Sequence, residues 1–139
     1  MKKAVNLSFL YAIFAMVGGV FYREFTKFNG FSGRTSLGFV HTHLFMLGMV
    51  MFLLVALLCK GTDLSTTKPF GLFWKLYNIG VPVSAVMFVV RGVPQVLGME
   101  LSRGMDAAIS GIAGIGHILT GVGIVCFFLA LRKVAAKAE

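Results

Sequence analysis

Three histidines are the residues of this chain best suited to chemistry, because all three lie inside apolar segments long enough to cross a membrane. His41 and His43 form a His-Thr-His pair, and His117 lies in the glycine-rich run 111–121. An ionisable side chain in hydrocarbon is costly, so such residues usually mark functional sites. Imidazole is a frequent ligand of metal ions and of haem iron. The histidines therefore predict a metal or haem site within the membrane.

Haem b is the cofactor that this pattern favours. Haem iron takes axial imidazoles and lies in an apolar slot. We expect His41 and His117 to provide the axial ligands, with His43 as an alternate or intersubunit ligand. Glycines near His117, such as Gly114 and Gly121, leave room for a flat macrocycle to approach the helix backbone. Bis-histidine ligation of one haem is the simplest arrangement of these residues.

Aromatic and cationic side chains are expected to complete the slot. Four phenylalanines are candidates for its walls: Phe39, Phe45, Phe52 and Phe88. The two haem carboxylates favour cations at the membrane edge, and Arg23, Arg34 and Arg91 are the candidates. Arg91 is also typical of an arginine that extends toward the interface, and Arg23 is expected to pair with Glu24 at a helix end.

Two other interpretations remain open. Three imidazoles also satisfy a trigonal or open tetrahedral ion, so copper or zinc held by His41, His43 and His117 is the alternative. Methionines near the His-Thr-His pair would add soft ligands for Cu(I), but they are spread around the helix. The third interpretation is a non-catalytic assembly subunit whose histidines only pack between helices.

The positions of the histidines can be compared in depth and direction. At 1.5 Å per residue, His41, His43 and His117 lie roughly 27, 24 and 21 Å from the cytoplasmic helix ends, so they share one layer. His43 points roughly 200° away from His41 around the helix. The His41 side also carries Gly38 and Gly48 and suits an interior. The His43 side would face lipid unless another subunit or a second cofactor covers it, or unless His43 lies near the outer interface and reaches for water.

Composition sets the class of protein that positions these residues. Hydrophobic residues make up 58% of the 139, charged residues only 13%, and the net charge is +8. A soluble domain is usually about 25% charged. Four apolar stretches, near 5–22, 37–59, 71–91 and 106–131, are long enough to span as helices. We therefore expect one all-α membrane domain, 1–139, built as a four-helix bundle with one small or polar stripe per helix facing inward.

Charge and proline placement refine this topology. Eight Lys and Arg residues against five favour both termini inside a bacterial inner membrane. The lysines near Met1 and the apolar run after them are interpreted as a retained first helix rather than a cleaved signal peptide. Pro82 and Pro94 are expected to kink or end the third helix. Cys59 and Cys126 have no metal-site spacing and are expected to pack as free thiols.

The His-Thr-His phrase carries a family resemblance. The segment 38–48, Gly-Phe-Val-His-Thr-His-Leu-Phe-Met-Leu-Gly, with four spans and a lone His117, resembles a family of short bacterial membrane proteins of unknown function. More distantly, the His-x-His pair is similar to that of the haem–copper oxidase catalytic subunit and its nitric-oxide-response relatives. That likeness implies haems on opposite faces of one helix. It also implies a trimer, because the oxidase subunit is arranged as three four-helix arcs.

Together these observations predict a membrane haem protein in electron transfer, haem handling or gas sensing. No nucleophile–base pair, paired intramembrane carboxylates or phosphate loop appears in the sequence, so a non-enzymatic role is favoured. The expected partners are the lipid bilayer and further copies of the chain, as a dimer or trimer. A redox partner or quinone is left open, and no basic stretch suits nucleic acid.

Overall fold

The computed structural model describes residues 1–137, and its regular elements are all helices. They are α1 (Lys2–Phe28), α2 (Gly38–His43), the π-helix η1 (Leu44–Val50), α3 (Met51–Leu58), the 3-10 helix η2 (Leu64–Thr66), α4 (Lys68–Leu97) and α5 (Arg103–Ala135). The caps between α2, η1 and α3 keep helical backbone angles, so these three elements form one continuous helix. The all-α prediction is confirmed.

Four helices are long and apolar enough to cross a membrane. They are Lys2–Phe28, Gly38–Leu58, Lys68–Leu97 and Arg103–Ala135. The protein is therefore a multi-pass membrane protein. The stretches expected from the sequence fall on these helices, but three of the helices run several residues further at their ends. Polar residues at the ends of α1 and α5 continue the helix beyond the apolar core.

Local capping explains where α4 and α5 begin and end. The Thr67 hydroxyl accepts the N–H of Phe70 at the start of α4, and the Ser102 hydroxyl accepts that of Met105 at the start of α5. Gly98, with φ +64°, ends α4 in the left-handed conformation. Of the two effects expected of Pro82 and Pro94, a kink or a helix end, the end is wrong, since α4 continues past Pro94 for three residues until the Gly98 cap is formed.

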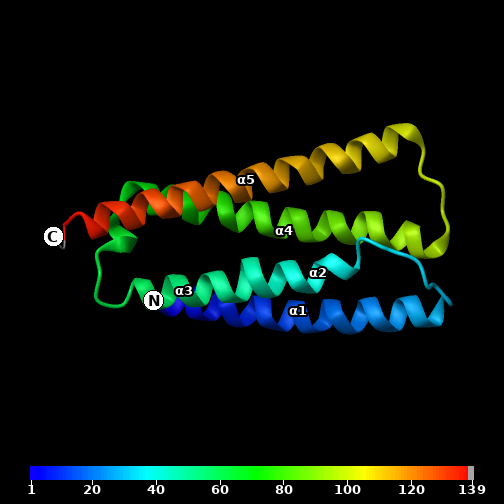
Figure 1. Cartoon of the computed structure of the whole chain (residues 1–139), viewed down its shortest axis with the longest axis horizontal. Coiled ribbons are helices and arrows are strands. Elements are labelled where there is room, and N and C mark those ends of the chain that lie inside the picture. Colours follow the sequence, from blue (N-terminus) through cyan, green and yellow to red (C-terminus); the bar gives the residue numbers. More distant parts are fainter. Residues whose placement is uncertain (138–139) are drawn as a thin grey trace.

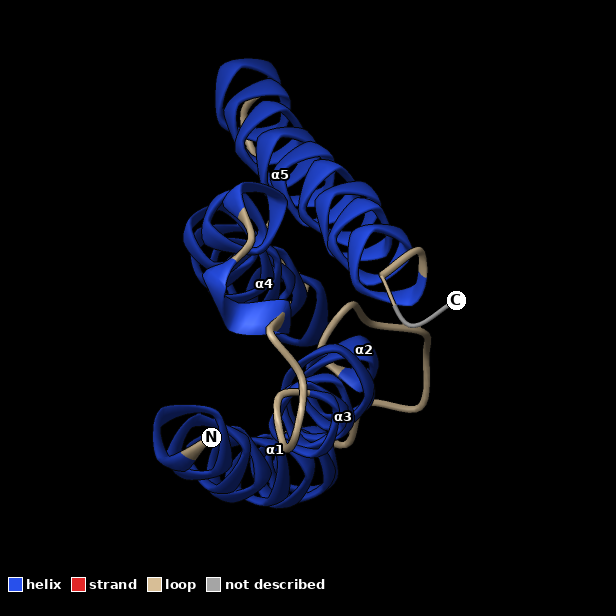
Figure 2. Ribbon diagram, turned by 90° about the vertical axis from the view of Figure 1, so that its left-hand side faces the viewer, coloured by secondary structure: helices blue, strands red, loops and turns tan. Residues whose placement is uncertain are grey.

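The four spans form two antiparallel hairpins rather than a bundle closed around a central site. The helix α2–η1–α3 packs along α1, α5 packs along α4, and the hairpins meet where α2 and η1 contact α4. In Figure 1 the N-terminus, the start of α4 and the end of α5 lie at one end of the molecule. Figure 2, seen along the helices, shows them as an open arc in the order α1, α2–α3, α4, α5.

Glycines let the backbones of α4 and α5 approach closely. A Cβ on Gly80 would lie 2.5–2.8 Å from atoms of Thr120 and Gly116. One on Gly116 would lie 2.7 Å from the Ser84 hydroxyl. Small residues at such contacts are the usual means of packing transmembrane helices. Part of the glycine-rich run in α5 therefore serves helix packing.

Aromatic rings fill the half of the molecule near both termini. Phe73 packs against Phe127 at 4.9 Å and against Tyr77 at 5.1 Å between ring centroids, and Tyr11 stacks on Phe52 at 5.6 Å. Phe52 is completely buried in this core. It contacts the aromatic rings of this core, and none of the three histidine rings is among its aromatic contacts. Phe45, which like Phe52 was expected in the wall of a haem slot, packs against the same core.

The cysteines lie in the same half and are free thiols. Cys126 is buried in the core, and Cys59 follows the last residue of α3. Burial raises the pKa of the Cys59 thiol, so it stays protonated at neutral pH. This agrees with packing as small apolar groups.

Candidate histidine site

His43 and His117 are brought together by the structure. Their ring centroids lie 6.3 Å apart and their planes are nearly perpendicular, at 79°. His43 is the last residue of α2, and His117 lies near the middle of α5. Although α2 and α5 belong to different hairpins, both side chains reach past α4 to the same place. The side of the helix that was expected to face lipid therefore meets the other hairpin.

Each of these imidazoles is oriented by a backbone carbonyl. The Nδ1 atom of His43 lies 3.0 Å from the Phe39 oxygen, and that of His117 lies 2.7 Å from the Ala113 oxygen. A carbonyl oxygen only accepts, so Nδ1 donates its proton in both residues. The neutral ring then keeps its lone pair on Nε2, the nitrogen free for a metal. Metal-binding histidines are commonly held in this way.

Two phenylalanines flank the histidine pair. Between ring centroids, Phe88 of α4 lies 4.6 Å from His43 and 5.8 Å from His117. The Phe39 centroid lies 5.7 Å from that of Phe88. Both residues were expected to wall the site. The three centroids of His43, Phe88 and His117 form a triangle whose longest side joins the two histidines. The Phe88 ring consequently lies beside the space between the imidazoles.

His41 lies on the opposite face of the helix, against α1. Its ring stacks on Tyr22, with 6.4 Å between ring centroids and 13° between planes, and a Cβ added at Gly19 of α1 would lie 3.6–3.9 Å from its side chain. The buried Nδ1 atom has no hydrogen-bond partner within residues 1–137. The expected pairing of His41 with His117 is thus not the one that the structure forms. The small residues on that side of α2 face α1 rather than a cofactor.

The α5 surface next to His117 is open. A Cβ added at Gly111, Gly114 or Gly121 would meet nothing within 4 Å, and the His117 side chain is exposed. Gly114 and Gly121 do leave room beside the imidazole, as expected. Within one chain, however, the described residues provide no wall opposite this surface.

The three arginines expected to bind the haem carboxylates lie in different parts of the structure and do not form one cluster. The Arg91 guanidinium lies 3.0 Å from the Asp106 carboxylate and donates to the Ser110 hydroxyl at 2.7 Å. Arg91 therefore joins the end of α4 to the first turns of α5. Arg23 lies 3.8 Å from Glu24, which confirms the expected helix-end pair, and Arg34 is exposed in the connection before α2.

The number of potential ligands limits which metal ions the site could hold. Among residues 1–137, no group of three or more His, Cys, Asp or Glu side chains could hold one metal ion. The arrangement of three imidazoles around a copper or zinc ion is therefore not formed within one chain. The pair of His43 and His117 offers two nitrogens only.

Residues 1–134 match the family described as "Protein of unknown function (DUF2871)". The chain belongs to this family. No curated protein and no solved structure gave a match. The resemblance carried by the His-Thr-His phrase and the four spans is confirmed at this level, and the family description carries no activity.

In this DUF2871 protein, one feature of the site could not be read from the sequence. The segment directly after His43, Leu44–Val50, is a π-helix. Such wider turns are rare and often occur near functional sites. They also shift the directions of side chains from those of a regular 100° wheel. Gly48 lies within this turn with the Tyr11 ring directly against it, and a glycine in an apolar run is its only sequence signal.

Proposed function

We propose that the chain binds one haem b between His43 and His117. The strongest support is that the Nδ1 atoms of both imidazoles are hydrogen-bonded to backbone carbonyls, which leaves both Nε2 atoms free to bind a metal. A metal with a nitrogen about 2.0 Å away on each side keeps the two ring centroids about 6 Å apart. The observed separation is 6.3 Å. The separation of the two rings therefore supports His43 and His117 as the pair that would hold one iron.

Ligand number favours haem over a bare ion. Two imidazoles complete the axial coordination of haem iron, whose other four ligands come from the macrocycle. Structural zinc takes four protein ligands, and catalytic zinc usually takes three. His43 and His117 have no third ligand beside them among residues 1–137. Copper or zinc binding would need ligands from another chain, so it is the second candidate.

A flat macrocycle fits this site on one condition. Phe88 lies beside the gap between the imidazoles, in contact with both. Its ring must rotate aside for the macrocycle to enter. The open surface at Gly114 and Gly121 gives space for the macrocycle on the α5 side.

Coordination by two histidines favours electron transfer over the other two expected roles, haem handling and gas sensing. Haem supplies one-electron chemistry, and two histidine ligands leave no iron position for a gas. The hydrogen bonds that His43 and His117 donate to the carbonyls of Phe39 and Ala113 hold the two rings in position and increase the basicity of Nε2. The distant likeness to the haem–copper oxidase subunit would add a second haem on the other helix face. Because α1 covers that face here, we propose a single haem per chain.

We also propose that copies of the chain associate in a bacterial inner membrane with both termini inside. Lys and Arg placement supports the orientation. The open α5 surface around His117 supports association, because a second copy would shield an imidazole that otherwise lies in lipid. A dimer or trimer would enclose the haem.

The test is the optical spectrum of the detergent-purified protein, oxidised and dithionite-reduced, before and after added haem. We expect a Soret band, sharp reduced α and β bands, and one haem per chain by pyridine haemochrome. A protein that stays colourless after haem is supplied would exclude this function. Copper and zinc analysis of the same sample would then decide between the ion-binding and purely structural alternatives.

A further inference from the structure

A second site is suggested by a cavity on the other side of the α2–η1 helix. The cavity of about 490 Å³ lies between α1, α2–η1 and α4, and none of the three histidines lines it. Its walls are almost entirely hydrocarbon, with Tyr11 and Asn78 as the polar side chains among its lining residues. Sites for small molecules are commonly about 300–1,000 Å³, largely apolar, with a few polar groups that fix orientation.

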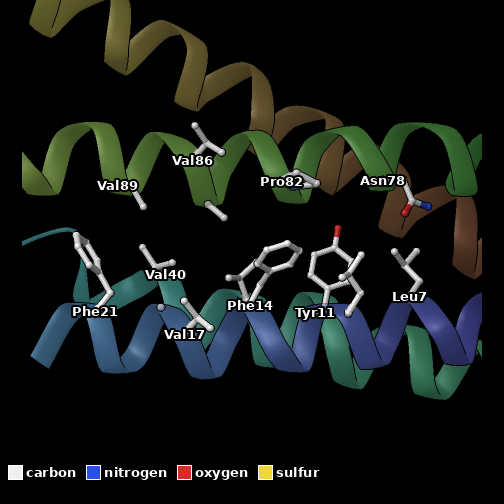
Figure 3. Close-up of a pocket in the computed structure, with 14 residues that line it drawn as sticks. Leu7, Tyr11, Phe14, Val17, Phe21, Val40, Asn78, Pro82, Val86 and Val89 are labelled. Carbon is white, nitrogen blue, oxygen red and sulfur yellow. The ribbon is translucent and has the colours of Figure 1, made fainter. Parts of the chain in front are cut away.

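The polar groups of this cavity face one another across it. Figure 3 shows the Tyr11 hydroxyl extending from α1 toward α4, and the Asn78 side chain extending from α4 toward α1. Tyr11 is only 6% exposed, and its hydroxyl makes none of the side-chain hydrogen bonds found among residues 1–137. The hydroxyl lines the cavity with its donor unused, so an acceptor bound there would gain a hydrogen bond.

Asn78 adds hydrogen-bond acceptors to the cavity. Its amide nitrogen donates to the Trp74 carbonyl at 2.7 Å, which leaves the amide oxygen available. Pro82 lies four residues later in α4 and has no N–H, so the main-chain carbonyl of Asn78 lacks its usual helical donor. The cavity thus provides one hydroxyl donor and carbonyl acceptors.

The depth of these groups indicates what kind of molecule they suit. Tyr11 is nine residues into α1 and Asn78 is ten into α4, so both lie about 14–15 Å from the helix starts at the same membrane side. That is about the middle of a hydrocarbon core about 30 Å thick. Phospholipid headgroups remain at the interface, and acyl chains carry no group that would bond to Tyr11. A lipid-soluble quinone carries ring oxygens into the hydrocarbon.

We propose that this cavity binds the ring of an isoprenoid quinone or quinol entering from the bilayer. The Tyr11 hydroxyl donates to a quinone oxygen, and the Asn78 oxygens accept from a quinol hydroxyl. Phe14 and Pro82, which also line the cavity, are placed to contact the ring faces. This binding does not depend on haem at His43 and His117.

Trp74 provides a direct measurement, because it is the only tryptophan and hydrogen-bonds Asn78. Decylubiquinone and a short-chain menaquinone would be titrated into the haem-free protein in lipid nanodiscs, and quenching of Trp74 fluorescence recorded. We expect saturable quenching by at least one of them. Tyr11→Phe should raise its dissociation constant about three- to tenfold, the effect of one lost hydrogen bond.

Two further variants keep the test decisive. Val86 lines the cavity and is 57% exposed, so Val86→Phe should fold and still block binding. Tyr77→Phe removes a buried hydroxyl outside the cavity lining and should bind as the wild type does. Organic extraction of the purified protein should yield about one quinone per chain. Quenching that does not saturate, or that Tyr11→Phe leaves unchanged, would overturn the proposal. So would an organic extract that contains phospholipid but no quinone.

Discussion

His41 and His43 stand two residues apart on one helix, yet their surroundings differ in nearly every respect. His41 lies against the partner helix of its own hairpin, stacked on Tyr22, with a buried Nδ1 that has no partner within residues 1–137. His43 lies between the hairpins, held by the Phe39 carbonyl and close to His117. One histidine is part of helix packing, and the other is available to a ligand.

The difference shows that a metal-ligand geometry requires orientation as well as a suitable residue type. A carbonyl partner on Nδ1 fixes both the tautomer and the ring direction of His43, and the same device operates at His117. His41 has neither a fixed tautomer nor an imidazole within aromatic contact. This contrast makes the haem proposal specific about which residues matter.

The largest effect is expected from His117→Ala. It removes an iron ligand contributed by the second hairpin, so haem affinity should fall by more than the about 10- to 100-fold typical of losing an outer-shell partner. Haem content after purification, measured by absorbance, reports the change. Ile118→Ala, at an exposed neighbouring position, is the matched control. An unchanged spectrum in His117→Ala would remove this residue from the site.

A smaller effect is expected from comparing the packed contact between α4 and α5 with the open face of α5. Gly80→Ala would force a methyl group into Thr120 and the Gly116 carbonyl, which should destabilise the protein by about 1–3 kcal/mol. Gly114→Ala meets nothing and should leave stability the same or slightly higher. Thermal unfolding in detergent, followed by circular dichroism, separates the two. Equal behaviour would mean that α4 and α5 do not pack as described.

Phe88 should control access to the histidine pair. Phe88→Ala removes the ring beside the gap and should speed haemin uptake several-fold, whereas Phe88→Trp should slow it. Stopped-flow absorbance measures both rates. Phe128→Trp, at an exposed position on α5, serves as the control for an added indole. Identical uptake in all variants would show that Phe88 does not limit entry.

The smallest effect is expected from Arg91→Gln. The pair with Asp106 is partly exposed, so its loss should cost at most about 1 kcal/mol of stability. Because Arg91 is already occupied by Asp106 and Ser110, haem affinity should change by less than about twofold. Haem titration of the variant measures this. A large loss of affinity would instead assign Arg91 to the haem carboxylates.

Much of the fold followed from local patterns in the sequence. The four spans and the buried side of α1, with Ser8, Tyr11 and Ala15, could be predicted because each depends on hydropathy and helical periodicity. The opposite directions of His41 and His43 could be predicted for the same reason. Local patterns also identified Phe39 and Phe88 as neighbours of the site.

The choice of histidine could not be predicted, because it depends on which helix faces which. Small residues beside His41 indicated a buried face, but both α1 and a cofactor would favour such residues. The π-helical turn after His43 likewise has Tyr11, a residue far away in the sequence, against its Gly48, and no local pattern marks it. Long-range arrangement, rather than side-chain type, determined the pair.

The most direct measurement of the central claim compares haem spectra of His41→Ala and His43→Ala, purified in parallel and supplied with equal haem. We predict that His41→Ala keeps the low-spin bis-histidine spectrum at wild-type haem content, with at most a small loss of stability. His43→Ala should lose haem or change to a five-coordinate spectrum. The reverse result, with haem lost in His41→Ala and retained in His43→Ala, would contradict the account.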